Sequence, residues 1–263
     1  MEQKHLFHLV DQSPWPFATA FSLFFFVSGL GFYMHRISFG FFYFILGSLL
    51  LLLCAYFWFN DIIKEATCEG NHTKVVKLGL KNGFYLFLTS EFMLFFGFFW
   101  AFFHSSMCPS IEIGGHWPPM GIDVIWTWGF PFYNTLILII SGFSITWVHQ
   151  SVALGNFKNS IDGFIVTISL GLLFIILQAI EYYEASYCIV DGIYGSVFYM
   201  LTGLHGSHVI IGIIFLIICF IRLIRNHFLR NHYLGLVFAI WYWHFVDIIW
   251  IILFLTVYFW GNW

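Results

Sequence analysis

Long apolar runs alternate with short polar segments along the whole chain. Runs of mainly apolar residues cover positions 15–34, 40–59, 83–104, 129–149, 161–183, 194–221 and 234–260. Each run is long enough for an α-helix to cross the hydrocarbon core of a bilayer, which takes about 20 residues. A spanning segment must pair its backbone polar groups internally, so a helix is the expected form of each run. The pattern therefore predicts an all-α, polytopic membrane protein with seven transmembrane helices.

Composition agrees with this prediction and removes other classes. Of 263 residues, 60% are hydrophobic and only 9% are charged, against about 25% charged in an ordinary soluble domain. The 10 Lys and Arg residues against 13 Asp and Glu leave no basic face, which excludes a nucleic-acid-binding protein. The five cysteines have no C-x-x-C pair and no zinc-type spacing, so neither a disulfide framework nor a cysteine metal site is expected.

The positive charges predict the orientation in the membrane. If the N-terminus lies inside, every Lys and Arg except Arg36 falls in an inner segment: Lys4, Lys64, Lys74, Lys77, Lys81, Lys158, Arg222, Arg225 and Arg230. Inner loops of membrane proteins carry such an excess, so we expect the N-terminus inside and the C-terminus outside. Receptor-type seven-helix bundles have the opposite orientation. Retinal proteins need a lysine in the last span, and this span has none.

One acidic residue, Glu91, lies well inside the third apolar run. A charge near the bilayer centre costs on the order of 2.5–3.5 kcal/mol on insertion scales, so such a residue needs a reason to be there. Glu91 is either a carboxylate that exchanges protons or binds a partner, or a protonated glutamic acid whose hydrogen bond locks two helices. The two interpretations are compatible, and both stay open.

Two further polar pairs lie inside later runs. His205 and His208 are three residues apart in the sixth run, and His244 and Asp247 repeat this spacing in the seventh. Two such faces could assemble a metal or haem site; alternatively, they form hydrogen bonds between helices. We favour hydrogen bonding and expect no metal and no catalytic residue, because neither of these two runs contains an E-x-x-H motif or a second carboxylate pair.

Two more carboxylates, Glu181 and Glu184, stand at the end of the fifth run. This position predicts that both are either solvated at the outer surface or bonded between loops, with a cation site as a minor alternative.

Short motifs along the whole chain resemble one known family, subunit III of the cytochrome c oxidases. The matching runs, in chain order, are H8LVD11, S13PWP16, E69GNHT73, T89SE91, F98FWAFFHSS106, G114GHWPP119, S144ITW147, D191GIYGS196, H205GSHVIIG212 and W241YWHFVD247. The chain departs from relatives at Phe59, Asn60 and Ser207.

The resemblance implies a function in aerobic respiration. The family belongs to the terminal oxidase that passes electrons from cytochrome c to oxygen and pumps protons. In that family subunit III carries no haem or copper, which are held by subunits I and II. It stabilises subunit I, binds structural phospholipids and supports proton uptake. The implied partners are therefore subunits I and II, accessory subunits and phospholipids.

The resemblance also implies an arrangement and a set of site residues. The helices form a two-helix and a five-helix bundle with a lipid-holding cleft, here residues 1–62 and 83–263, joined by an inner, matrix-side loop at 63–82. Glu91 matches the family's buried glutamate. Positions at the lipid cleft are matched by Trp58, Glu65, His72 and Arg222, and polar positions of the five-helix bundle by His205, His208, His244 and Asp247. We expect these last four to hydrogen-bond to one another or to Glu91.

The resemblance also indicates where the protein resides. The family occurs in the mitochondrial inner membrane and, alternatively, in bacterial plasma membranes. The absence of a presequence and the 36 phenylalanines favour a multi-pass protein made inside the mitochondrion. A secondary transporter with a buried carboxylate is the first rival, but transporters often contain inverted repeats and none is visible. A membrane metalloenzyme is the second rival, but the two polar helix faces supply too few ligands for a metal.

Overall fold

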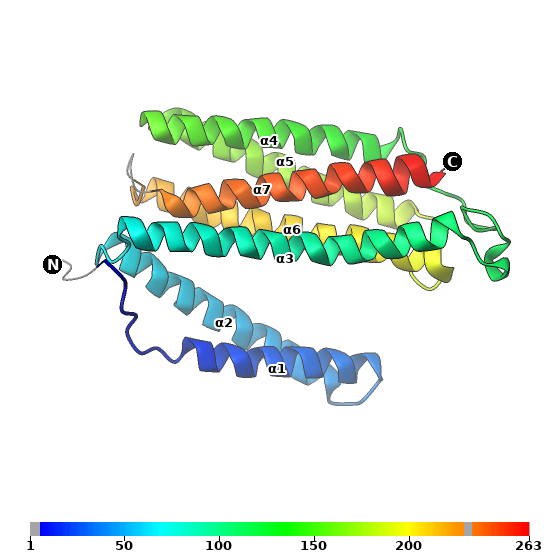
Figure 1. The fold of residues 1–263 in the computed structure, drawn as a ribbon, viewed down its shortest axis with the longest axis horizontal. Helices are drawn as coiled ribbons and strands as arrows, with labels where there is room; N and C mark the ends of the chain where they lie inside the picture. The colour runs from blue at the N-terminus through cyan, green and yellow to red at the C-terminus, as the bar shows by residue number, and fades with distance from the viewer. Residues whose placement is uncertain (1–5, 229–232, 263) are drawn as a thin grey trace. The chain divides into compact units, whose positions relative to one another are not determined.

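A computed structural model describes residues 6–228 and 233–262, and the regular secondary structure in this part of the chain is all helical. Seven helices are long and apolar enough to cross a membrane, so the predicted fold class is confirmed. They are α1 (Trp15–Met34), α2 (Gly40–Thr67), α3 (Lys74–Met107), α4 (Phe130–Leu154), α5 (Phe157–Glu184), α6 (Gly192–Ile224) and α7 (Leu234–Leu253), with short segments η1 (Ile111–Ile113), η2 (Phe254–Phe259) and η3 (Trp260–Asn262) (Figure 1). Lys4 and Arg230, which contribute to the predicted orientation, lie outside the described residues.

Helices α2 and α3 extend well beyond their apolar runs. The expected loop over 63–82 is mostly helical, because α2 continues to Thr67 and α3 begins at Lys74. Only residues 68–73 connect them. With 34 residues, α3 is about 51 Å long, whereas the hydrocarbon core is about 30 Å thick. The charged residues at these helix ends thus lie on turns that extend past the apolar region, and hydrophobicity alone does not detect such turns.

The chain forms two compact units, Met1–Asn82 (unit 1) and Gly83–Trp263 (unit 2). In unit 1, α1 and α2 pack side by side as an antiparallel pair (Figure 1). Their backbones touch at Gly29, Gly40 and Gly47, where an added Cβ would collide with the backbone of the opposite helix. Small residues allow this close packing between membrane helices, so the glycines set the spacing of the pair.

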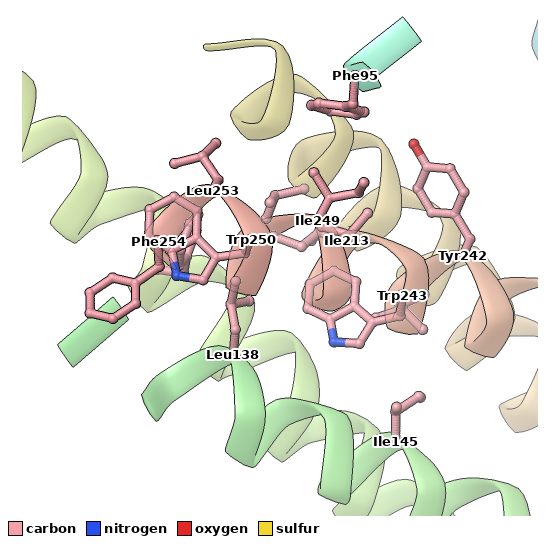
Figure 2. Close-up of a cluster of buried hydrophobic side chains, with 14 of the residues drawn as sticks. Phe95, Leu138, Ile145, Ile213, Tyr242, Trp243, Ile249, Trp250, Leu253 and Phe254 are labelled. Atoms are coloured by element: carbon pink, nitrogen blue, oxygen red, sulfur yellow. The ribbon is translucent and has the colours of Figure 1, made fainter. Parts of the chain in front are cut away.

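Unit 2 contains the main buried core, drawn in Figure 2. Its largest fully buried side chains include Trp243 and Trp250 of α7. Their indole N–H groups donate to hydroxyls on α4, Trp243 to Ser141 Oγ at 2.9 Å and Trp250 to Thr135 Oγ1 at 3.1 Å. A buried indole needs an acceptor for its N–H group, so these two bonds fix α7 against α4.

The C-terminal end of α7 changes its helical form. Residues Phe254–Phe259 continue the helix as a π-helical segment, η2. The carbonyl oxygen of Tyr258 accepts a hydrogen bond of 2.6 Å from Thr127 Oγ1. A π-helical turn fits one more residue than the α-helical turn it replaces, and such turns often mark functional sites.

Candidate functional site

A carboxyl–imidazole pair joins α3 to α6 inside unit 2. The Oε2 atom of Glu91 lies 2.8 Å from Nε2 of His208. The side chain of His208 is only 9% exposed and that of Glu91 22%. The rings of Phe95 and Tyr242 lie 5.1 and 6.3 Å from the imidazole, between ring centroids. Two polar side chains thus pair within an aromatic environment.

The second ring nitrogen of His208 limits how protons are arranged in this pair. His208 Nδ1 lies 2.8 Å from the carbonyl oxygen of Leu204. A carbonyl oxygen only accepts, so Nδ1 carries a proton. The contact with Glu91 then contains one proton, either on Glu91 as O–H···N or on His208 as N–H···O. In both arrangements the pair is neutral as a whole, which lowers the cost of placing it in a bilayer.

The other polar residues predicted on α6 and α7 have separate partners. His205 is fully buried, and its Nε2 contacts the carbonyl oxygen of Val246 at 3.2 Å. His244 Nε2 lies 3.3 Å from Thr146 Oγ1, while its Nδ1 is 3.9 Å from Asp247 Oδ2, too long for a hydrogen bond. Among the hydrogen bonds of the described residues, His208 is therefore the one member of these four that contacts Glu91.

A glycine that sequence reasoning missed makes room for Asp247. A Cβ added at Gly142 of α4 would lie 2.7 Å from Asp247 Oδ2. Asp247 is 7% exposed, so its carboxyl group occupies the space that the missing side chain leaves on α4. Gly142 falls inside an apolar run, and its sequence position gives no sign of this role.

Glu181 is buried, so the expectation that it is solvated at the outer surface is wrong. The residue is 2% exposed. Its Oε1 accepts hydrogen bonds from Tyr258 Oη at 2.5 Å and from Gln178 Nε2 at 3.2 Å. Gln178 Oε1 in turn lies 3.4 Å from Asn134 Nδ2. The sequence signal for the hydrogen bond between Gln178 and Glu181 is their spacing, because residues three apart share a helix face.

The residues predicted at the lipid cleft lie in both units. Trp58, Glu65 and His72 belong to unit 1, and all three are half-buried. Arg222 belongs to unit 2, where its guanidinium carbon lies 4.7 Å from the centroid of the Phe228 ring. Their contact with lipid stays a prediction.

One group of side chains in the described part of the chain has the composition and spacing of a metal site. It consists of His8, Glu65 and His72 of unit 1, which offer one ligand atom each within 4.8 Å of one another. The polar faces of α6 and α7 form no such group within the described residues.

Comparisons with known proteins agree with the sequence motifs. A family model described as cytochrome c oxidase subunit III matches residues 5–262. Relatives named cytochrome c oxidase subunit 3 include the proteins of Prototheca wickerhamii, 50% identical, and Equus asinus, 49% identical, each match covering 99% of both chains. The protein of Arabidopsis thaliana is 48% identical over 99% of this chain and 98% of its own length. The chain therefore belongs to the cytochrome c oxidase subunit III family.

Proposed function

We propose that this chain acts as a subunit without a redox centre in the respiratory terminal oxidase, complex IV. That enzyme passes electrons from cytochrome c to oxygen and pumps protons. The observation that carries the proposal is identity at about half of all positions, over 99% of the chain, to proteins named as this subunit. Partner subunits I and II would hold the haem and copper, with accessory subunits around them.

The hydrogen bonds of unit 2 support a role that does not include ligating haem or copper. Both ring nitrogens of His208 contact protein oxygens, from Leu204 and Glu91. The Nε2 atom of His205 contacts a backbone carbonyl. Histidines held in this way position helices, which suits a subunit that stabilises subunit I.

The pair of Glu91 and His208 supports a contribution to proton uptake. It holds one exchangeable proton between two side chains in the membrane. The partial exposure of Glu91, at 22%, gives this proton a way to and from the surface of unit 2. Helix packing and proton uptake would then use the same hydrogen bond.

Phospholipid binding is the second part of the proposal. In unit 1 the half-buried Trp58, Glu65 and His72 would contact headgroups, and in unit 2 Arg222 would attract a phosphate. Unit 2 also has an apolar groove of about 570 Å³ along α3, lined by Phe92, Phe96, Phe99, Trp100, Phe103, His104, Met107, Cys108 and Ile252. Such a lining suits an acyl chain.

The proposed location is the mitochondrial inner membrane, with the N-terminus on the matrix side. A bacterial plasma membrane is the alternative. Seven spanning helices support a multi-pass protein in either case.

Mild purification of the chain from its native membrane tests the proposed complex. A reduced-minus-oxidised spectrum of the purified material should contain haem a absorbance, because subunits I and II would accompany the chain. A spectrum without haem would count against membership in the oxidase.

Proton uptake is tested in the purified oxidase by substituting Glu91→Gln, with Glu112→Gln on exposed η1 as the matched control. We expect slower proton uptake per electron in the first variant only. Equal uptake in both variants would mean that Glu91 contributes only to helix packing.

A further inference from the structure

Three side chains that ligate metals come together in unit 1 from three separate segments. His8 precedes α1, Glu65 lies on the last turn of α2, and His72 lies in the connection to α3. One ligand atom from each lies within 4.8 Å of the other two. We propose that His8, Glu65 and His72 bind one divalent transition-metal ion, with Zn²⁺ as the ion this ligand set suits.

A hydrogen bond holds the N-terminal segment against the start of α3. Thr73 Oγ1 donates to the carbonyl oxygen of Leu6 at 2.6 Å and accepts from the Val76 N–H group at 3.3 Å. Leu6 is two residues from His8, and Thr73 follows His72 directly. The two imidazole rings consequently face each other edge-on, with centroids 6.0 Å apart and an interplanar angle of 62°.

The third ligand is tied to this arrangement through the backbone. The Asn71 N–H group donates to the carbonyl oxygen of Glu65 at 3.1 Å, which folds the connection back over the end of α2. The C-terminal end of a helix carries a partial negative charge that favours a cation. Glu65 therefore presents its carboxylate where the backbone of α2 already attracts positive charge.

The distances fit metal binding with a small adjustment. Zn²⁺ binds imidazole nitrogen and carboxylate oxygen at about 2.0–2.2 Å, so a tetrahedral ion spaces its ligand atoms by about 3.4 Å. Ligand atoms that now lie up to 4.8 Å apart would have to approach by about 1.4 Å at most. All three side chains are half-buried, and rotation about their side-chain bonds provides this movement.

The ligand types select the class of metal. Two imidazoles and one carboxylate suit Zn²⁺ and neighbouring transition metals, whereas Mg²⁺ and Ca²⁺ prefer all-oxygen sites. The fourth position would be open to water. This inference departs from the sequence-based expectation that the chain binds no metal. It is independent of the proposed oxidase function, although it shares Glu65 and His72 with the proposed lipid contacts.

A zinc titration of the full-length chain in phosphatidylcholine nanodiscs tests the site. Equilibrium dialysis against buffered Zn²⁺, followed by elemental analysis, should give one saturable site per chain that excess Mg²⁺ does not displace. Substituting His8→Gln or His72→Gln should weaken binding by more than about tenfold. The matched control is His35→Gln, an exposed histidine of the same unit just after α1, and its affinity should equal that of the wild type.

A thiolate substitution separates loss of a ligand from loss of the fold. Cysteine is also a zinc ligand, so His72→Cys should bind Zn²⁺, and X-ray absorption should then detect one sulfur neighbour in place of one imidazole. Absence of saturable binding in the wild type would overturn the proposal. So would binding that persists unchanged in His8→Gln and His72→Gln, or zinc in His72→Cys without a sulfur neighbour.

Discussion

Replacing Glu91 by leucine and by glutamine reveals what the contact with His208 contributes. Leucine removes every partner of His208 Nε2, whose side chain is only 9% exposed. An unsatisfied buried polar atom costs about 1–3 kcal/mol, so we expect Glu91→Leu to lower the free energy of unfolding by that amount. Glutamine can donate an amide N–H to the same nitrogen, so Glu91→Gln should cost less than about 1 kcal/mol if Glu91 is normally protonated.

The charged arrangement predicts a larger loss of stability in both variants. If His208 is an imidazolium facing a carboxylate, both substitutions leave a charge without its partner, at a cost of about 3–5 kcal/mol. The comparison of the two variants therefore also determines where the proton lies.

Equilibrium unfolding in mixed micelles, followed by tryptophan fluorescence, measures these free energies. A double-mutant cycle with His208→Phe isolates the pair, and the coupling energy should be at least about 1 kcal/mol. Free-energy changes that simply add in the double variant would refute the pairing. Glu112→Gln serves as the control for loss of an exposed carboxylate.

Three further predictions concern other parts of the chain. Gly47→Leu should separate α1 from α2, because its side chain has no room at the backbone contact; limited proteolysis of unit 1 would detect this. Tyr258→Phe removes a donor from buried Glu181 and should lower the free energy of unfolding by about 1–3 kcal/mol in the same micelle assay. Burial raises the pKa of the Tyr187 phenol, so the unfolded chain ionises this group first, and stability should fall above about pH 10. Tyr187→Phe should lose less stability between pH 8 and 11 in thermal unfolding.

Each of these predictions has a result that would contradict it. Gly31 on α1 has open space beside it, and Gly31→Leu should therefore leave the proteolysis pattern unchanged; equal cleavage in both glycine variants would mean that close packing is unimportant. A fully stable Tyr258→Phe would show that Gln178 alone satisfies Glu181. An identical pH profile for Tyr187→Phe would mean that this phenol ionises in the folded protein.

The sequence predicts the spans well and the helix ends poorly, for a physical reason. Hydrophobicity reports the bilayer, so the first run, 15–34, coincides with α1. It does not report helical turns beyond the bilayer, and Lys64 and Lys74 consequently lie on helices where a loop was expected.

The sequence predicts that Glu91 has a polar partner, but it does not identify that partner. The prediction rests on the fact that a polar residue in a membrane needs another polar group to contact. The partner, His208, is 117 residues away in sequence, and the spacing of residues within one helix does not select it from the other polar residues. The group of His8, Glu65 and His72 is invisible for the same reason, since only folding of the N-terminal segment brings His8 to the other two.

The π-helical segment η2 sets the directions of the side chains that follow it. Its wide turns hold one more residue than α-helical turns would. If the same residues formed a regular α-helix, every residue after the extra one would turn by about 100° around the helix axis, and Tyr258 would point away from Glu181. Substitutions can change side chains here one at a time, but a change from π-helical to α-helical form redirects all of them together. We therefore expect functional variants to keep the π-helical form of this stretch even where its exposed side chains differ.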